Sequence, residues 1–259
     1  MLKPRIIPTL LLKDGGLVKT TKFDHPRYIG DPINAVKIFN EKEADELILI
    51  DIDASQMGKE PDYRLIERIA NECRMPLSVG GGIKTLDQAN RILGFGVEKI
   101  LISSLLIENP NMISEMVGYL GSQSVVVCLD LKKTLLTKKY EFCIHNGKNK
   151  TGKYLEEVLN LATTLGAGEI VLNSIDLDGT MTGFDIDLIQ YVKKRISVPL
   201  TVLGGAGSLD HLKDVISHVG VIGVAAGSLF IYKGKLKAVL INYPDRDLKS
   251  SFYDLLSYG

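Results

Sequence analysis

The chain has 259 residues, of which 45% are hydrophobic and 24% are charged. This length and balance are typical of a globular protein with one large core, and we expect a single domain over residues 1–259. Its 31 lysine and arginine residues equal its 31 aspartate and glutamate residues, which excludes a general electrostatic attraction to nucleic acid or to an anionic membrane. We therefore expect no nucleic-acid and no membrane partner.

The cysteines and the N-terminal apolar run predict a reduced, cytoplasmic protein. Cys73, Cys128 and Cys143 are far apart, odd in number and outside any metal-ligand spacing, so we expect no disulfide framework, no metal and no cofactor. The apolar run at residues 5–12 is about as long as one strand, too short for a membrane span or a signal peptide.

Eight apolar, β-branched runs follow one another along the chain, and each precedes a segment with helical spacing of apolar residues. The runs are continuous rather than alternating, as expected for parallel strands covered on both faces. They occupy residues 5–12, 46–53, 76–81, 99–104, 124–131, 169–176, 199–205 and 220–228. Eight such units predict an α/β fold, the (β/α)8 TIM barrel. An open, doubly wound sheet is the alternative.

An internal repeat favours the barrel over the open sheet. The motif "IDIDAS" at residue 50 returns as "IDLDGT" at residue 175, and "VGGG" at residue 79 returns as "LGGA" at residue 203. Both offsets are close to half the chain, so the last four units are expected to be a copy of the first four. Two similar half-barrels close naturally into one barrel.

One long interruption separates the fifth strand from its helix. Residues 132–151, "KKTLLTKKYEFCIHNGKNKT", alternate in polarity and contain an Asn-Gly pair, which predicts a small inserted hairpin. A solvated surface hairpin and a lid over the barrel mouth both fit this pattern.

Glycines and serines follow four of the predicted strands, at the rim where barrels of this type keep their active sites. Glycine lets backbone N–H groups approach an anion, although it also serves tight turns and close packing. The half-chain repeat of these residues favours two phosphate sites, hence a ligand with a phosphate at each end. The candidate phosphate-binding residues are Gly81, Gly82, Ser103 and Ser104 in one half and Gly204, Gly205, Gly227 and Ser228 in the other.

Acidic residues also follow the predicted strands, and any of them could simply cap a helix. Asp130 is the best candidate for a catalytic acid or base, because it ends the apolar run "VVVCLD" and apolar neighbours raise the pKa of a carboxyl group. Its natural partner across the barrel would lie on the first strand. That strand ends in Leu10, Leu11 and Leu12.

Over essentially its whole length, the chain resembles the HisF family, the cyclase subunit of imidazole glycerol phosphate synthase. The matching motifs, in order, are "RIIPTLLLKDGGLVK", "GDP" at 30–32, "DELILIDIDAS", "VGGGIKT", "SQSVVVCLD", "GAGEIVLNSIDLDGTMTGFD" and "GGAG". The resemblance implies a barrel that receives ammonia from a glutaminase subunit docked at its bottom and adds it to a ligand at the opposite rim. It also supports the two phosphate sites.

The resemblance further implies an ammonia gate formed by Arg5, Glu46, Lys99 and Glu169, at the beginnings of the first, second, fourth and sixth predicted strands. Charges that flank strands are otherwise usually solvated. Two positive and two negative side chains can, however, neutralise one another in a buried ring.

The chain departs from the family at the first strand. The family has a catalytic aspartate at the position of Leu11, paired with the one at Asp130, and leucine cannot carry a proton. Leu203 and Ser103 also stand where the family usually has serine and asparagine. By the resemblance, Lys19 and Asp178 join Asp130 around the ammonia exit.

We therefore expect a HisF-like synthase subunit that still conducts ammonia. A HisF-like branch that serves acetamidino-sugar formation for a bacterial surface polysaccharide fits this pattern, with a phosphorylated or nucleotide-sugar substrate and a sugar amidotransferase as a further partner. One alternative is a genuine cyclase of histidine biosynthesis. The other is a non-catalytic ammonia conduit or scaffold.

Overall fold

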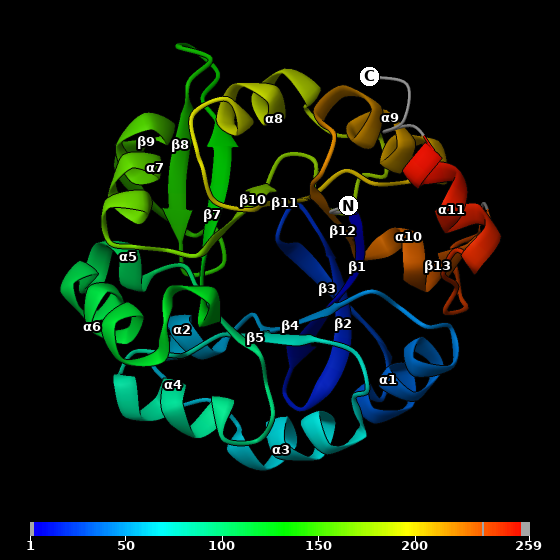
Figure 1. Ribbon diagram of the computed structural model, residues 1–259, viewed down its shortest axis with the longest axis horizontal. Helices are drawn as coiled ribbons and strands as arrows, with labels where there is room; N and C mark the ends of the chain where they lie inside the picture. The colour runs from blue at the N-terminus through cyan, green and yellow to red at the C-terminus, as the bar shows by residue number, and fades with distance from the viewer. Residues whose placement is uncertain (1–2, 235, 255–259) are drawn as a thin grey trace.

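The computed structural model describes residues 3–234 and 236–254. Within them, eight parallel strands close into a barrel around the middle of the molecule (Figure 1). The barrel strands are β1 (Arg5–Lys13), β4 (Leu47–Asp51), β5 (Leu77–Gly80), β6 (Lys99–Ile102), β7 (Val125–Lys133), β10 (Glu169–Ser174), β11 (Leu200–Leu203) and β12 (Gly223–Ala226). Pairing of β7 with β10 and of β12 with β1 completes the circle and confirms the predicted barrel over the open sheet.

Helices form a ring outside the strands (Figure 1). They are α1 (Pro32–Glu41), α2 (Ala54–Met57), α3 (Tyr63–Glu72), α4 (Leu86–Leu93), α5 (Leu105–Glu108), α6 (Pro110–Leu120), α7 (Leu155–Thr164), α8 (Ile186–Lys193), α9 (Leu209–Val219), α10 (Ser228–Ile231) and α11 (Arg246–Asp254), with a 3-10 turn η1 at Ser122–Ser124. Three of the longer helices, α1, α3 and α8, begin where an aspartate caps them: Asp31, Asp62 and Asp185 each accept a backbone N–H of the first turn. None of the helices in the described residues is both long and apolar enough to cross a membrane.

The strands separate two apolar cores, because successive side chains point to opposite faces. On β1, Ile6 and Leu10 pack outward against the helices, whereas Ile7 packs inward into the barrel lumen. The inner core consists of Ile7, Ile48, Leu101, Val126, Cys128, Val171, Leu203 and Ala225. By this alternation, Leu11 and Asp130 also point inward.

Two antiparallel hairpins extend the barrel at corresponding positions of the two halves. Strands β8 (Tyr140–Ile144) and β9 (Asn149–Tyr154) extend β7, which confirms the predicted insertion. Strands β2 (Gly16–Thr21) and β3 (Asp24–Gly30) extend β1 as a second hairpin, which the sequence did not reveal. The turn of this second hairpin places Lys22 and Phe23 in the left-handed region, with φ of 54° and 62°, and lacks the Asn-Gly pair that would have revealed it.

A short hairpin, β13 (Tyr232–Lys233) and β14 (Ala238–Val239), and helix α11 complete the described chain. This C-terminal part packs near the amino ends of the first two barrel strands. The Tyr243 hydroxyl donates to the carbonyl of Ile6 at 2.8 Å and accepts the N–H of Asp45 at 3.1 Å. Asp45 also accepts from Ile6 N–H and from Lys249 Nζ, so it braces the fold internally.

Candidate active site

A cavity opens at the carboxyl ends of the barrel strands and encloses about 1000 Å³ of empty space, part of it open to solvent. Its walls include all three predicted catalytic side chains, Lys19, Asp130 and Asp178, together with Leu11. Residues that lie 159 positions apart in the chain are therefore brought to one place by the closure of the barrel.

Asp130 lies at the floor of this cavity with only neutral hydrogen-bond partners. Asn173 Nδ2 donates to one carboxylate oxygen at 2.8 Å, and Ser103 Oγ donates to the other at 3.0 Å. Burial raises the pKa of Asp130 to about 6, because no cation offsets the desolvation and these hydrogen bonds oppose it only in part. A carboxyl group with this pKa can exchange a proton near neutral pH.

Lys19 and Asp178 face the same cavity from β2 and from the loop after β10. Lys19 is only 5% exposed, and its ammonium group donates to the carbonyl oxygen of Thr9 at 2.6 Å. Burial lowers the pKa of Lys19 to about 8, against the opposing field of Asp178. Burial likewise raises the pKa of Asp178, although Lys19 and a hydrogen bond from Thr20 at 3.0 Å oppose this.

Leu11 lines the cavity from β1, where its backbone is in register with Ile50 of β4 and Val18 of β2. The side chain therefore adds an apolar wall to the cavity across the barrel mouth from the buried carboxyl of Asp130. Asp51 is another carboxylate of the cavity wall. One of its oxygens accepts the N–H groups of Asp53 and Ala54, both at 3.0 Å, so it holds the start of α2.

The candidate phosphate-binding residues divide into two groups. Gly81, Gly82 and Ser104 of one half and Gly227 and Ser228 of the other line the cavity. Gly81 and Gly82 have φ of 105° and 74°, and a Cβ at Gly82 would lie 2.7 Å from the carbonyl oxygen of Lys59. Glycine is thus required by the backbone path here, whatever binds.

Ser103 also lines the cavity, but its hydroxyl donates to Asp130. Gly204 and Gly205 are not among the residues that line the cavity, and Gly205 packs so closely on the carbonyl of Gly183 that any side chain would collide with it. The backbone path thus requires glycine here as it does at Gly81 and Gly82.

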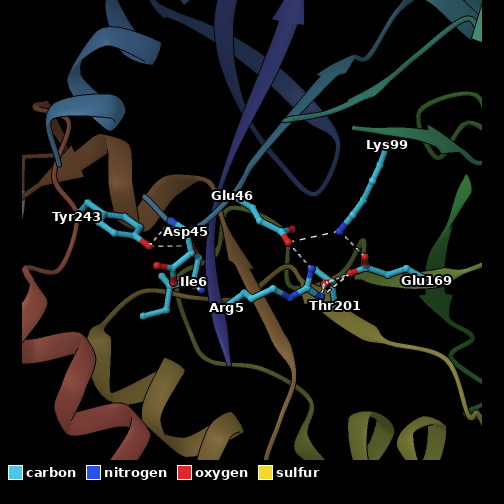
Figure 2. A network of polar contacts seen from close by, with 8 residues as sticks. All are labelled: Arg5, Ile6, Asp45, Glu46, Lys99, Glu169, Thr201 and Tyr243. Carbon is cyan, nitrogen blue, oxygen red and sulfur yellow. Dashed lines mark hydrogen bonds and ion pairs between the residues drawn. The ribbon is translucent and has the colours of Figure 1, made fainter. Parts of the chain in front are cut away.

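At the opposite end of the barrel, the four predicted gate residues form one closed ionic ring (Figure 2). Arg5 bridges Glu46 at 2.6 Å and Glu169 at 2.8 Å. Lys99 completes the ring with contacts to the same two carboxylates at 3.4 Å and 2.9 Å. The ring is largely buried, with side-chain exposures between 8% for Glu169 and 25% for Arg5.

Mutual neutralisation dominates the electrostatics of this ring. Burial alone would raise the pKa of Glu169, but Arg5 and Lys99 outweigh it, and the pKa falls to about 2. The same contacts raise the pKa of the Arg5 guanidinium, against desolvation. Glu169 and Arg5 therefore keep their charges over the whole physiological range.

Sequence reasoning missed three polar side chains of the lumen: Thr201, Asn173 and Thr9. Thr201 Oγ1 donates to Glu169 at 2.6 Å and joins the ring, and Asn173 anchors Asp130. Thr9 Oγ1 and Asn173 Oδ1 are buried without a hydrogen-bond partner within the described part of the chain. All three lie at inward positions of barrel strands, where the sequence predicts core residues. Only the strand register of the closed barrel shows which polar groups they meet.

Apart from these polar groups, the lumen above the ring is lined mainly by the apolar side chains of the inner core. Residues 3–234 and 236–254 contain no group of three or more histidine, cysteine, aspartate or glutamate side chains that could hold a metal ion.

Comparison with known proteins assigns the chain to a family. The histidine biosynthesis protein family matches residues 5–237. A Leptospira borgpetersenii protein, provisionally named imidazole glycerol phosphate synthase subunit HisF, is 66% identical over 98% of this chain and its own full length. A Vibrio vulnificus protein provisionally named hisF3 is 55% identical over 98% of both chains.

A third relative carries the HisF name without qualification. The imidazole glycerol phosphate synthase subunit HisF of Exiguobacterium sibiricum is 39% identical over 89% of this chain and 91% of its own. With the closed barrel, these matches confirm the expected resemblance: the chain belongs to the histidine biosynthesis protein family and, within it, to the HisF-like barrels.

Proposed function

We propose that this HisF-like subunit admits ammonia at the ionic ring, conducts it through the barrel and delivers it to an acceptor at the mouth, in the formation of an acetamidino sugar for a surface polysaccharide. The observation that carries the proposal is the contrast between an intact ring and the leucine, Leu11, that faces the cavity across the mouth from Asp130. A chain that retained ring closure and cleavage of the histidine pathway would need two proton carriers there. This mouth keeps a leucine in place of one.

The proposed route suits neutral ammonia rather than ammonium ion. The ring spans the bottom of the barrel and would have to open, so that entry is coupled to its ion pairs. The inner core beyond it offers no countercharge, and an ammonium ion there would be costly to desolvate. Ammonia would reach Asp130 as a free base able to act as a nucleophile.

At the mouth, we assign Asp130 the role of general base or acid. Its pKa near 6 lets the carboxylate accept a proton from the attacking amine and return it to the leaving oxygen. Lys19, with a pKa near 8, is suited to stabilise negative charge that develops on the acceptor, and Asp178 would hold that ammonium group in place.

Phosphate binding in this proposal uses Gly81, Gly82 and Ser104 on one side of the cavity and Gly227 and Ser228 on the other. An acceptor with one phosphate or a diphosphate could use either side. Retention of both sides favours the second candidate function, a genuine cyclase that acts on the bisphosphate of the histidine pathway.

The partners we propose are a glutaminase at the bottom of the barrel and a sugar amidotransferase at the mouth. The ring is the support for the first, since a source of ammonia must lie against it. The names hisF3 and hisF2 of two relatives, from Vibrio vulnificus and Pseudomonas aeruginosa, are those expected for HisF proteins additional to a first one. Such additional copies would be free to serve another pathway.

The test reconstitutes the barrel with a glutaminase and the sugar amidotransferase and follows acetamidino-sugar formation from glutamine. The proposal expects product only when all three proteins are present, and glutaminase turnover that rises when the barrel is added. Separate elution of glutaminase and barrel, with no stimulation, would refute the docking. Full activity without the barrel would refute the pathway.

A further inference from the structure

The turn between β7 and β8 presents two leucines to solvent. Within the sequence "KKTLLTKK", residues 132–139, which we name the KKTLLTKK tip, Leu135 is 88% exposed and Leu136 is 97% exposed. Isolated exposed leucines are ordinary on protein surfaces. Two adjacent leucines at the end of a hairpin, however, form a small apolar surface that the described residues leave uncovered.

The tip is ordered by its own hydrogen bonds. Thr134 N–H donates to the carbonyl of Lys139 at 2.8 Å, and Lys138 N–H donates to the carbonyl of Thr134 at 3.1 Å. The hydroxyls of Thr134 and Thr137 lie 2.6 Å apart, so both threonines are engaged below the leucines. The leucines are therefore held outward by a formed turn.

Four lysines flank the apolar point, and all four are exposed: Lys132, Lys133, Lys138 and Lys139. Lys133 lies 4.0 Å from Asp185, a weak contact at the limit of an ion pair. Among the residues that the structure describes, Lys132 and Lys138 have no ion-pair partner. In a chain of zero net charge, positive charge is thus gathered around this turn.

Figure 1 shows the β7–β8 hairpin reaching past the ring of helices at the edge of the molecule. It leaves the carboxyl end of β7, whereas the ionic ring lies at the amino ends of the strands. A large flat surface in contact with the tip would therefore leave the ring accessible.

We propose that the KKTLLTKK tip attaches the protein to an anionic lipid bilayer, with Leu135 and Leu136 inserted among the acyl chains and the four lysines at the headgroups. Apolar side chains flanked by basic ones are the pattern of interfacial membrane binding, in which apolar burial and attraction to anionic lipid add. Charge balance over the whole chain predicted no membrane partner. The tip itself carries four lysines, so its local charge is positive although the chain as a whole is neutral.

A bilayer fits the tip better than a protein pocket does. Stable protein interfaces bury about 800 Å² on each partner, far more than one turn can supply. A bilayer requires no complementary shape and meets both the leucines and the lysines at once.

The experiment is co-sedimentation of the full chain with vesicles of pure phosphatidylglycerol or pure phosphatidylcholine. We expect binding to the anionic vesicles only, and release at 1 M salt, where the screening length falls to about 3 Å. The double variant Leu135→Ser/Leu136→Ser should lose at least about tenfold in affinity. Tyr119→Ser, which removes an aromatic side chain that is 70% exposed near the end of α6, is the control and should bind as the wild type does.

Absence of wild-type binding to phosphatidylglycerol would overturn the proposal in favour of a protein with an acidic pocket. Equal binding of the leucine double variant would overturn it as well, because lysines alone would then carry the contact. Neither result depends on ammonia transfer, so the proposed function stands or falls separately.

Discussion

Both ends of the barrel bury ionisable side chains, but the two environments shift the pKa of a carboxyl group in opposite directions. At the bottom, Glu169 lies between Arg5 and Lys99, and its pKa falls to about 2. At the mouth, Asp130 has neutral hydrogen-bond partners and faces the apolar Leu11 across the barrel, and its pKa rises to about 6. A buried carboxyl group is thus held charged at one end and is able to exchange a proton at the other.

The largest effect is expected when the ring loses one member. Glu169→Gln leaves Arg5 and Lys99 largely buried with half of their counter-charge, and should lower the free energy of unfolding by about 3 kcal/mol or more. Urea denaturation measures this. The control is Glu43→Gln at the exposed pair with Arg246, where solvent screens the charges and we expect a much smaller loss. Equal losses in the two variants would show that burial of the ring does not increase the cost of removing one charge.

At the mouth, Asp130→Asn should leave the fold intact and reduce ammonia transfer to the acceptor by about 100-fold or more, the usual scale for loss of a general acid or base. Turnover with ammonium salt in the reconstituted system measures it. Asp176→Asn is the matched control, because Asp176 accepts a backbone N–H from Lys133 and does not line the cavity. A loss of only a few-fold for Asp130→Asn would favour the passive conduit.

Stability should depend on pH in opposite directions at the two ends. The pKa of Glu169 is depressed from 4.5 to about 2, so its stabilising contribution is present above pH 4.5 and is lost as pH falls towards 2. The pKa of Asp130 is raised from 3.8 to about 6, so its contribution is present below pH 3.8 and is lost as pH rises through 6.

Urea unfolding over a pH series measures both contributions. The difference in free energy of unfolding between the wild type and Glu169→Gln should shrink below pH 4.5. The free energy of unfolding of the wild type should instead rise relative to that of Asp130→Asn as the pH falls from 6 to 3.8. Each change should be on the order of 3 kcal/mol at most. Differences that do not vary with pH would contradict these two environments.

The smallest effect is expected from replacing Leu11, the apolar side chain that faces Asp130 across the mouth. Leu11→Asp would place a second carboxylate in the cavity and should raise the pKa of Asp130 further, by like-charge repulsion. Carbon-13 NMR titration of the aspartate carboxyl groups measures it. Leu11→Asn supplies a neutral polar side chain of similar size and should leave that pKa near 6. An unchanged pKa in Leu11→Asp would mean that the two side chains do not share one environment.

Much of this arrangement could be predicted from local sequence. Continuous apolar runs and the half-chain repeat specify parallel strands and their number, and a charged first residue on Arg5, Lys99 and Glu169 marks the strand entrances. The β2–β3 hairpin could not be predicted, because Lys22 and Phe23 carry no turn signature. Its left-handed turn depends on tertiary contacts such as the hydrogen bond from Lys22 N–H to the carbonyl of Asp178.

The site could be predicted residue by residue only in part. That Asp130 ends an apolar strand is visible in the sequence, but its hydrogen bonds to Asn173 and Ser103 depend on strand register around a closed barrel. The repeated glycines show a second limit. A Cβ at Gly204 or Gly205 would collide with a backbone carbonyl, as it would at Gly81 or Gly82, so the sequence does not separate glycines required by packing from glycines that bind phosphate.

The most direct test of the contrast between the two ends is an assay with the histidine-pathway bisphosphate and ammonium salt, in which purified protein is monitored for imidazole glycerol phosphate. With Leu11, which cannot carry a proton, across the mouth from Asp130, we predict no product above the rate without enzyme. Turnover at about 1 s⁻¹ or faster, ordinary for an enzyme, would show that the reaction does not need a proton carrier at Leu11 and would contradict the account.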